Sequence, residues 1–161
     1  MFRVGIGYDV HPFARRGQAR PLMLGGVEIP GSPGLAGHSD ADVLLHSISD
    51  AVLGALGRGD LGRHFPDTDP KTEGVSSLIL LEQVVALMRE QGYRLINLDS
   101  VVIAQQPRLA GHLDRMRRRI SEVMGATEAE VNVKGTSPEG LGSLGKKEGI
   151  AAESVVLIGK V

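Results

Sequence analysis

Two histidines and an aspartate in the first third of the chain have the types and spacing of metal ligands. Asp9 and His11 stand two residues apart near the end of a strand expected over residues 2–11, so their side chains should point to one face. His46 follows on an expected helix. The chain has 0 Cys, which leaves Asp and His as zinc ligands. Three protein ligands with one open position are typical of a catalytic zinc site. The alternative is two hydrogen-bonded histidines and an aspartate that caps a loop.

The segment Gly37-His38-Ser39-Asp40 comes directly before that helix. Helix N-termini bind anions readily, so His38 could help to hold a phosphate there. The alternative is that Ser39 or Asp40 simply caps the helix, and the two roles are compatible.

Residues 57–74 form a long polar connection in which we expect little regular structure. It contains Gly59-Asp60-Leu61-Gly62 and Phe65-Pro66-Asp67-Thr68-Asp69-Pro70. Its three aspartates could lie near sugar hydroxyls or a second metal ion. They could equally be there because aspartate favours turns.

A second loop of interest, Lys134-Gly135-Thr136-Ser137-Pro138-Glu139, follows a short expected strand over 131–134. A lysine, two hydroxyls, backbone amides and a carboxylate could hold a phosphate and its Mg²⁺. The next residues, 140–146, fit the start of a P-loop, G-x-x-x-x-G-K. However, Lys147 stands where Ser or Thr is required and the segment leads into a strand, which argues against a nucleoside-triphosphate site.

The length of 161 residues and the formal net charge of -1 indicate one domain over residues 1–161 that is not a nucleic-acid binder. No apolar run approaches the ~18–20 residues that span a membrane, and Met1–Gly5 does not resemble a signal peptide. We therefore expect a cytoplasmic protein. The 22 glycines indicate either many tight turns or backbone that approaches a ligand closely. Because eight of them flank the loops above (7, 37, 59, 62, 135, 140, 142 and 145), we favour approach to phosphates.

Hydrophobic spacing predicts alternating strands and helices. A short hairpin or bend is expected over 21–30, and the first helix should start near Ser39 or Asp40 and end near Leu56. Further helices are expected over 76–91 and from Leu109 to Val123, and further strands over 94–104 and 151–158. This alternation indicates a sheet covered by helices, with the first and last strands central. Arg115, Arg117, Arg118 and Arg119 could form an anion-binding face, but a solvated helix face is favoured.

Taken in order, these motifs resemble the 2-C-methyl-D-erythritol 2,4-cyclodiphosphate synthase family. The resemblance covers essentially the whole chain. It rests on the segments 7–11, 24–30, 38–46, 59–62, 65–70, 103–105, 132–134 and 148–149. It implies an α/β (α+β) two-layer sandwich, in which helices cover one face of a mixed sheet, and a homotrimer with active sites between subunits.

The resemblance implies zinc held by Asp9, His11 and His46. It also implies Mg²⁺ or Mn²⁺ held by Glu139 and the diphosphate of a cytidine diphosphate-linked methylerythritol 2-phosphate. The implied catalytic residues are His38 and Ser137. Asp42 and Asp50 could orient a zinc-bound imidazole, although Asp42 suits the first turn of a helix equally well.

The implied substrate contacts fall in four groups. The group around the metal is Asp9, Val10, His11, His38 and Ser39, and the erythritol group is Asp60, Leu61, Gly62, Phe65, Pro66, Asp67, Thr68 and Asp69. The cytidine pocket would come from a partner subunit's loop, Ala104, Gln105, Gln106, Pro107, Arg108, Leu109 and Ala110, and from Thr136 and Ser137. Pro138 and Glu139 are further implied substrate contacts. Ser143 and Lys146 complete the set, although the family pattern leads us to expect an aromatic residue and an arginine at these two positions. Lysine binds phosphate as a point charge rather than through two parallel hydrogen bonds.

The implied reaction is an intramolecular phosphoryl transfer, in which the 2-phosphate attacks the β-phosphorus and CMP leaves. The attacking phosphate is already an anion, so no general base is required, and catalysis rests on positioning and charge stabilisation. Zinc would act as a template and Lewis acid, and His38 and Ser137 would donate hydrogen bonds to the developing charge. The alternatives are a zinc-dependent phosphodiesterase and a non-catalytic trimeric carrier with structural zinc.

Overall fold

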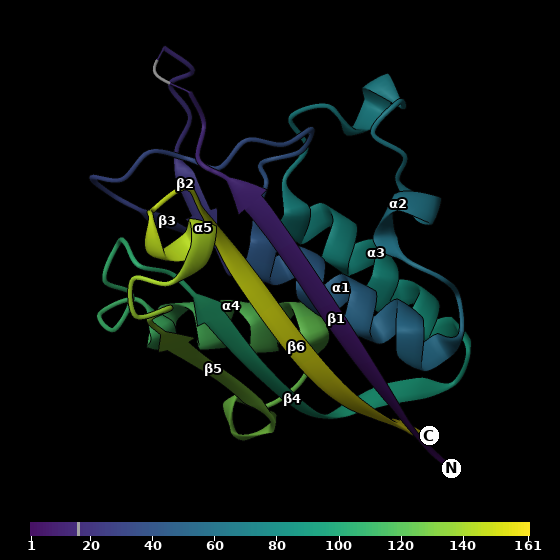
Figure 1. Ribbon diagram of the computed structural model, residues 1–161. Helices are drawn as coiled ribbons and strands as arrows, with labels where there is room; N and C mark the ends of the chain where they lie inside the picture. The colour runs from purple at the N-terminus through teal and green to yellow at the C-terminus, as the bar shows by residue number, and fades with distance from the viewer. Residues whose placement is uncertain (16) are drawn as a thin grey trace.

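The computed structural model describes residues 1–15 and 17–161 (Figure 1). A mixed sheet has the strand order β1-β6-β4-β5, formed by β1 (Phe2–Pro12), β6 (Gly149–Lys160), β4 (Tyr93–Ile103) and β5 (Val131–Thr136). β6 runs antiparallel to both β1 and β4, and β4 is parallel to β5. The carboxyl ends of β1, β4 and β5 therefore lie along the same edge of the sheet.

Three longer helices, α1 (Val43–Leu56), α3 (Ser77–Glu90) and α4 (Leu113–Met124), cover one face of this sheet. α1 packs on β1 and β6, and α4 packs on β5. Leu44, Leu45 and Ile48 of α1 are fully buried in the layer between helices and sheet, where each contributes about 1.5–3 kcal/mol of hydrophobic stabilisation. The expected mixed sheet with helices on one face is confirmed.

The short elements lie in the connections. β2 (Leu22–Leu24) and β3 (Val27–Ile29) form the expected hairpin. α2 (Leu61–His64) and the 3₁₀ turn η1 (Pro70–Thr72) lie within the connection over 57–74, η2 (Glu128–Glu130) precedes β5, and α5 (Gly142–Gly145) precedes β6. The segment 140–146 therefore leads through a four-residue helix into a strand, which is not P-loop architecture. No helix in the described ranges is both long and apolar enough to cross a membrane.

The prediction that β1 is central is wrong, because it forms an edge of the sheet. Its apolar side chains, including Val4 and Ile6, are exposed, whereas Gly5 and Gly7 face α1. A Cβ on Gly5 would lie 1.9 Å from the Ala51 carbonyl oxygen. The alternation of apolar and small residues thus predicted the strand. It did not predict which face packs on α1, because that helix rests directly on the backbone of Gly5 and Gly7.

At several positions the glycine has a cause other than the expected close approach of the backbone to phosphates. A Cβ on Gly7 would lie 2.0 Å from the Ser47 carbonyl oxygen, and one on Gly145 would lie 2.1 Å from the Gly140 carbonyl carbon. A Cβ on Gly37 would meet Ala41 Cβ at 2.8 Å. At these three positions protein atoms, rather than phosphates, explain the need for glycine.

The first helix starts at Val43, a few residues later than the predicted start near Ser39 or Asp40. Its N-cap is Asp42, whose fully buried carboxylate accepts hydrogen bonds from the backbone N–H groups of Leu45, Gly25 and Gly26. The hairpin turn between β2 and β3 therefore fixes the cap. The second long helix has its predicted start at Ser76, which is its N-cap. Leu109, predicted at the start of the third, lies buried in the turn before α4.

Candidate metal centre and flanking pockets

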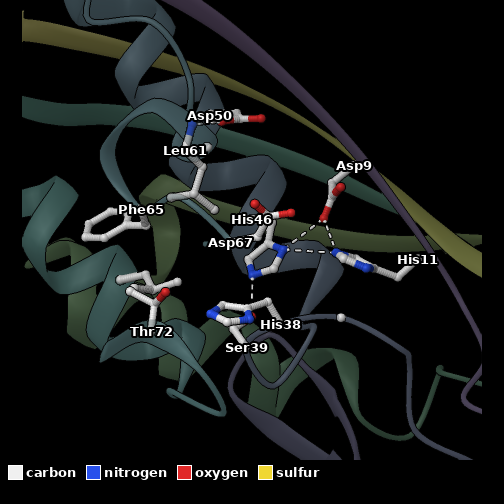
Figure 2. Close-up of a pocket in the computed structure, with 13 residues that line it drawn as sticks. Asp9, His11, His38, Ser39, His46, Asp50, Leu61, Phe65, Asp67 and Thr72 are labelled. Carbon is white, nitrogen blue, oxygen red and sulfur yellow. Dashed lines mark hydrogen bonds and ion pairs between the residues drawn. The ribbon is translucent and has the colours of Figure 1, made fainter. Parts of the chain in front are cut away.

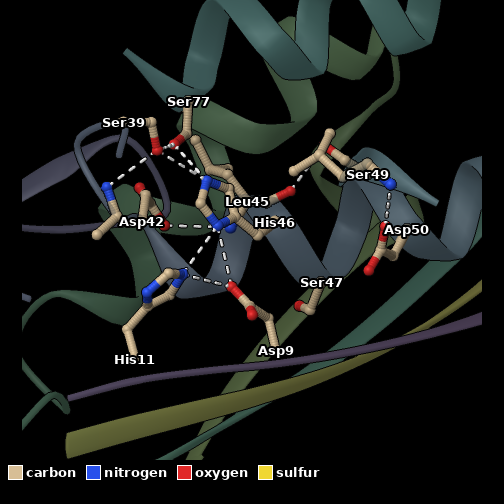
Figure 3. A network of polar contacts seen from close by, with 12 residues as sticks. Asp9, His11, Ser39, Asp42, Leu45, His46, Ser47, Ser49, Asp50 and Ser77 are labelled. Atoms are coloured by element: carbon tan, nitrogen blue, oxygen red, sulfur yellow. Dashed lines mark hydrogen bonds and ion pairs between the residues drawn. The ribbon is translucent and has the colours of Figure 1, made fainter. Parts of the chain in front are cut away.

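Asp9, His11 and His46 meet at the carboxyl end of β1 (Figures 2 and 3). Asp9 Oδ2 lies 2.9 Å from His11 Nε2 and 2.9 Å from His46 Nδ1. The two ring nitrogens are 3.2 Å apart, and the three ligand atoms all lie within 4.8 Å of one another. The structure thus brings together the three residues that the sequence predicted as a metal group.

Close packing of α1 on β1 places His46 opposite the strand. Asp9 and His11 share one face of β1, as their spacing predicted, and that face is the one that α1 covers. Gly7, two residues before Asp9, lets the α1 backbone approach so closely that His46 reaches Asp9. A larger residue at position 7 would separate the ligands.

Hydrogen bonds on the outer side of each imidazole determine which nitrogen faces the cluster. His11 Nδ1 lies 2.8 Å from the Ala36 carbonyl oxygen, which can only accept, so Nδ1 carries a proton and Nε2 faces Asp9. His46 Nε2 lies 2.9 Å from Ser77 Oγ, so His46 presents Nδ1. Two ring nitrogens and a carboxylate oxygen that converge in this way require a proton or a cation between them. The donor set fits a divalent metal ion such as zinc.

The same contacts shift the pKa values of the cluster. Burial favours the neutral acid at Asp9, but the hydrogen bonds and charges of His11 and His46 outweigh it and lower the pKa of this carboxyl. Burial opposes protonation of His11, but the hydrogen bond and charge of Asp9 outweigh it and raise the pKa of this imidazole. Asp9 is therefore an anion, as a metal ligand must be, and protons compete with metal for His11.

Asp42 and Asp50 do not orient an imidazole, contrary to one of the sequence interpretations. Asp42 caps α1, and burial raises its pKa to about 6 despite the amides that it accepts. Asp50 accepts a hydrogen bond of 2.7 Å from Leu61 N–H and so anchors the turn that starts α2; burial raises its pKa too. The groups that contact His46 Nε2 are instead the hydroxyls of Ser77, at 2.9 Å, and Ser39, at 3.1 Å.

Sequence reasoning missed two residues around this centre. Ser77 lies on α3, and its Oγ donates to the carboxylate of Asp40. Arg20 donates from its guanidinium to the carbonyl oxygens of Gly37 and Ser39, on either side of His38. Their sequence positions carry no motif. The one hint of a role for Ser77 was its place beside Ser76 at the start of the helix expected over 76–91.

A pocket of about 380 Å³ opens beside the cluster (Figure 2). Nine of its lining residues were predicted near the metal or the erythritol: Asp9, His11, His38, Ser39, His46, Leu61, Gly62, Phe65 and Asp67. The lining is Asp9, His11, Gly37, His38, Ser39, His46, Asp50, Leu61, Gly62, Phe65, Asp67, Thr72 and Leu80. The predicted residues Asp60, Pro66, Thr68 and Asp69 belong to the same loops but do not line this pocket, and Val10 points to the opposite, exposed face of β1.

A separate pocket of about 420 Å³ lies at the carboxyl ends of β4 and β5. It is lined by Ala104, Gln105, Pro107, Arg108, Leu109, Ala110, Leu113, Gly135, Thr136 and Ser137. Gln106, Pro138 and Glu139 lie in the same two loops without lining it. This is the region that the sequence assigned to a cytidine, and no described residue lines both pockets.

The loop after β5 is exposed and held mainly through its backbone. Glu139 donates its N–H to Ser137 Oγ at 2.9 Å, and Gly140 donates its N–H to Gln105 Oε1 at 2.9 Å. Glu139, Ser143 and Lys146 are exposed. Within one chain, the structure does not bring these three residues to the Asp9–His11–His46 group.

Three of the four arginines of α4 form ion pairs with glutamates. Arg117 and Arg118 pair with Glu128, and Arg119 pairs with Glu122. This supports the favoured interpretation of a solvated helix face.

The fold and the cluster define an α/β protein in which a group of residues that could hold a metal ion lies at the carboxyl end of the edge strand. Residues 2–159 match the YgbB family. A 2-C-methyl-D-erythritol 2,4-cyclodiphosphate synthase of Bacillus cereus (strain B4264) is 54% identical over 160 residues, which cover 99% of each chain.

Solved structures agree with this match. The bifunctional IspDF of Campylobacter jejuni superimposes with a TM-score of 0.94 at 44% identity; all of this chain is covered, but it spans only 43% of that chain. IspF of Plasmodium falciparum, in a CDP complex, superimposes with a TM-score of 0.85 at 34% identity, over 99% of this chain and 96% of that one. The chain therefore belongs to the YgbB family of 2-C-methyl-D-erythritol 2,4-cyclodiphosphate synthases, which form a cyclic diphosphate in the isoprenoid pathway.

Proposed function

We propose that this chain converts 4-diphosphocytidyl-2-C-methyl-D-erythritol 2-phosphate to 2-C-methyl-D-erythritol 2,4-cyclodiphosphate and CMP, as a divalent-metal-dependent, cyclising phosphorus–oxygen lyase of the cytoplasm. The observation that carries the proposal is the Asp9–His11–His46 group, already assembled beside a pocket in a chain of this family. Zinc is the ion proposed for this group, and Mg²⁺ or Mn²⁺ is proposed at Glu139.

The proposed reaction makes one bond and breaks one. An oxygen of the 2-phosphate attacks the β-phosphorus, and the bond from that phosphorus to the bridging oxygen breaks, so that CMP leaves with the α-phosphate. When bound, the metal ions supply positive charge that polarises the phosphoryl oxygens. The contribution of the chain is to hold the substrate folded, because an attacking phosphate needs no general base.

His38 and Ser137 are proposed as hydrogen-bond donors to the phosphates. His38 Nε2 donates to the Asp69 carbonyl oxygen at 3.0 Å, so the ring can donate to a substrate from Nδ1 once it is protonated. Asp69, in the loop proposed to contact the erythritol, would thus orient His38. Ser137 would act from the pocket at the carboxyl ends of β4 and β5.

A homotrimer is proposed because the two pockets of one chain are separate and β1 exposes an apolar face. That face, named here the β1 face, consists of side chains that are 42–69% exposed: Phe2, Val4, Ile6, Tyr8, Val10 and the neighbouring Val155. A contiguous exposed apolar surface of this kind is typical of a protein interface. Closed rings bury such a face by joining different surfaces of neighbouring copies, which can bring one copy's metal group to the next copy's cytidine pocket.

Product analysis tests this proposal. With the cytidine diphosphate-linked substrate in H₂¹⁸O, ³¹P NMR should show a cyclic diphosphate and CMP in equal amounts, with no ¹⁸O in either. Linear phosphates that carry ¹⁸O would instead indicate a metal-dependent phosphodiesterase. Zinc bound without any turnover would indicate a carrier.

A further inference from the structure

His46 is the metal ligand whose outer nitrogen is held by two buried hydroxyls. Its Nε2 lies 2.9 Å from Ser77 Oγ and 3.1 Å from Ser39 Oγ (Figure 3). The Ser77 side chain is fully buried between the loop before α1 and the start of α3. Its contact with His46 links two segments that are 31 residues apart.

The direction of the hydrogen bonds follows from the chemistry of a serine hydroxyl, which has a single proton. Ser77 Oγ donates that proton to Asp40 Oδ1. Ser77 Oγ must therefore accept the proton of His46 Nε2. This arrangement keeps the proton of the neutral imidazole on Nε2 and leaves Nδ1 free to bind a cation beside Asp9.

Asp40 is itself held in a fixed position. Its Oδ2 accepts a hydrogen bond of 3.0 Å from Ser77 N–H, and its Oδ1 accepts one of 3.1 Å from Asp42 N–H. Its own N–H donates to the Val75 carbonyl oxygen at 3.0 Å. The carboxylate is therefore anchored to both the start of α3 and the cap of α1.

We propose that Asp40 and Ser77 are positioning residues that fix the ring orientation and the tautomer of His46 for metal binding. The carboxylate polarises the Ser77 hydroxyl, which in turn makes the imidazole a stronger ligand. Because Asp40 lies two residues after His38, the relay also ties the loop that carries His38 to the metal group. The inference rests on the proposed metal site, but its test measures binding of the metal and not turnover.

Three variants isolate the relay. Ser77→Ala removes it, Asp40→Asn leaves the hydroxyl but removes the charge, and Ser77→Thr keeps a hydroxyl. Ser76→Ala is the matched control, because Ser76 caps the same helix by accepting from Leu78 N–H and does not contact His46.

Zinc affinity is measured by competition with a chromophoric chelator, and the ligand field by the visible spectrum of the Co²⁺ form. We expect Ser77→Ala to weaken zinc binding by about 10- to 100-fold and to change the Co²⁺ spectrum. Asp40→Asn should have a smaller effect in the same direction, Ser77→Thr should restore part of the affinity, and Ser76→Ala should match the wild type. In the substrate assay, kcat should fall while KM changes little.

Wild-type zinc affinity and an unchanged Co²⁺ spectrum in folded Ser77→Ala would overturn the relay. If Ser77→Ala does not fold, Asp40→Asn is the test variant. Wild-type zinc affinity in Asp40→Asn would then overturn the proposal. A wild-type protein that binds zinc through His46 but forms no cyclic product would refute the proposed reaction while leaving the relay testable. A wild-type protein that binds no zinc at this group would refute the metal site and the relay together.

Discussion

The pocket beside Asp9, His11 and His46 and the proposed cytidine pocket are built in different ways. Asp9, His11 and His46 are half-buried, and each imidazole is held on its outer side by a carbonyl or a hydroxyl. The loop that carries Ser137 and Glu139 is exposed, and its described hydrogen bonds run mainly through backbone N–H groups. One pocket is thus organised by the packing of its own chain, whereas the other leaves its functional side chains in solvent.

This difference implies that the two pockets depend on contacts between subunits to different degrees. Ligands fixed by helix packing should bind metal even in an isolated subunit. Exposed side chains such as Glu139 acquire partners only from a ligand or another subunit. The following predictions, in order of decreasing effect on activity, separate these two behaviours.

Removing a metal ligand should have the largest effect. His46→Ala should abolish stoichiometric zinc binding and lower kcat/KM by about a thousandfold or more, because a metal ion supplies several kcal/mol of charge stabilisation. Zinc content by mass spectrometry and rates with the cytidylyl substrate check this. His64→Ala is the control, since His64 is exposed on α2 and donates to the Arg58 carbonyl oxygen. Normal activity in His46→Ala would show that the centre is not catalytic.

A charge on the β1 face should separate metal binding from activity. Ile6→Glu should dissociate the assembly and lower activity by about 100-fold, because an uncompensated charge at a buried interface costs several kcal/mol. Zinc affinity should stay within a few-fold of the wild type. Light scattering gives the mass, and Ile79→Glu, on an exposed apolar residue of α3, is the control. An active monomer would refute the shared site.

Glu139 should matter only when substrate is present. Glu139→Gln should lower kcat by about 10- to 100-fold and raise the Mg²⁺ or Mn²⁺ concentration needed for half-maximal rate, because a neutral amide is a weaker ligand for hard cations. Zinc content should not change. Glu90→Gln, on the exposed end of α3, is the control. An unchanged metal requirement would remove Glu139 from the second ion.

The smallest effect concerns pH. Because the pKa of His11 is raised in the fold, its protonation stabilises the metal-free protein. This stabilisation is fully present below the unfolded pKa of about 6.5 and is lost as pH rises through the higher folded value. Thermal melts should show this trend in metal-free protein and not in His11→Asn. Zinc affinity should weaken as pH falls through the same range, and a pH-independent affinity would contradict the competition between proton and metal.

Local patterns predicted most of the fold and the metal ligands. Asp9 and His11 share a face because strand side chains alternate, and this rule needs no knowledge of the partner elements. The inward face of β1 was not predictable in that way, because the residues that pack there are Gly5 and Gly7. Helix α1 fills the space that their missing side chains leave.

The contacts around His46 illustrate what helical spacing cannot predict. Asp42 and Asp50 stand four residues before and after His46, which suggested a contact along one side of α1. Instead, His46 Nε2 meets α3 through Ser77, while Asp42 caps α1 and Asp50 anchors α2. Likewise the start of α1 depends on amides of the β2–β3 turn, which are distant in sequence from Asp42. Such tertiary contacts leave no periodic pattern.

Mixing two inactive variants tests most directly that the metal group and the Glu139 loop of different subunits form one active site. His46→Ala and Glu139→Ala are dissociated, mixed in equal amounts and reassembled, and native mass spectrometry verifies mixed trimers. Random assembly joins an intact metal half to an intact cytidine half at about a quarter of the interfaces of a closed ring. The account predicts about a quarter of wild-type activity and cyclic product. Mixed trimers that remain inactive would contradict it.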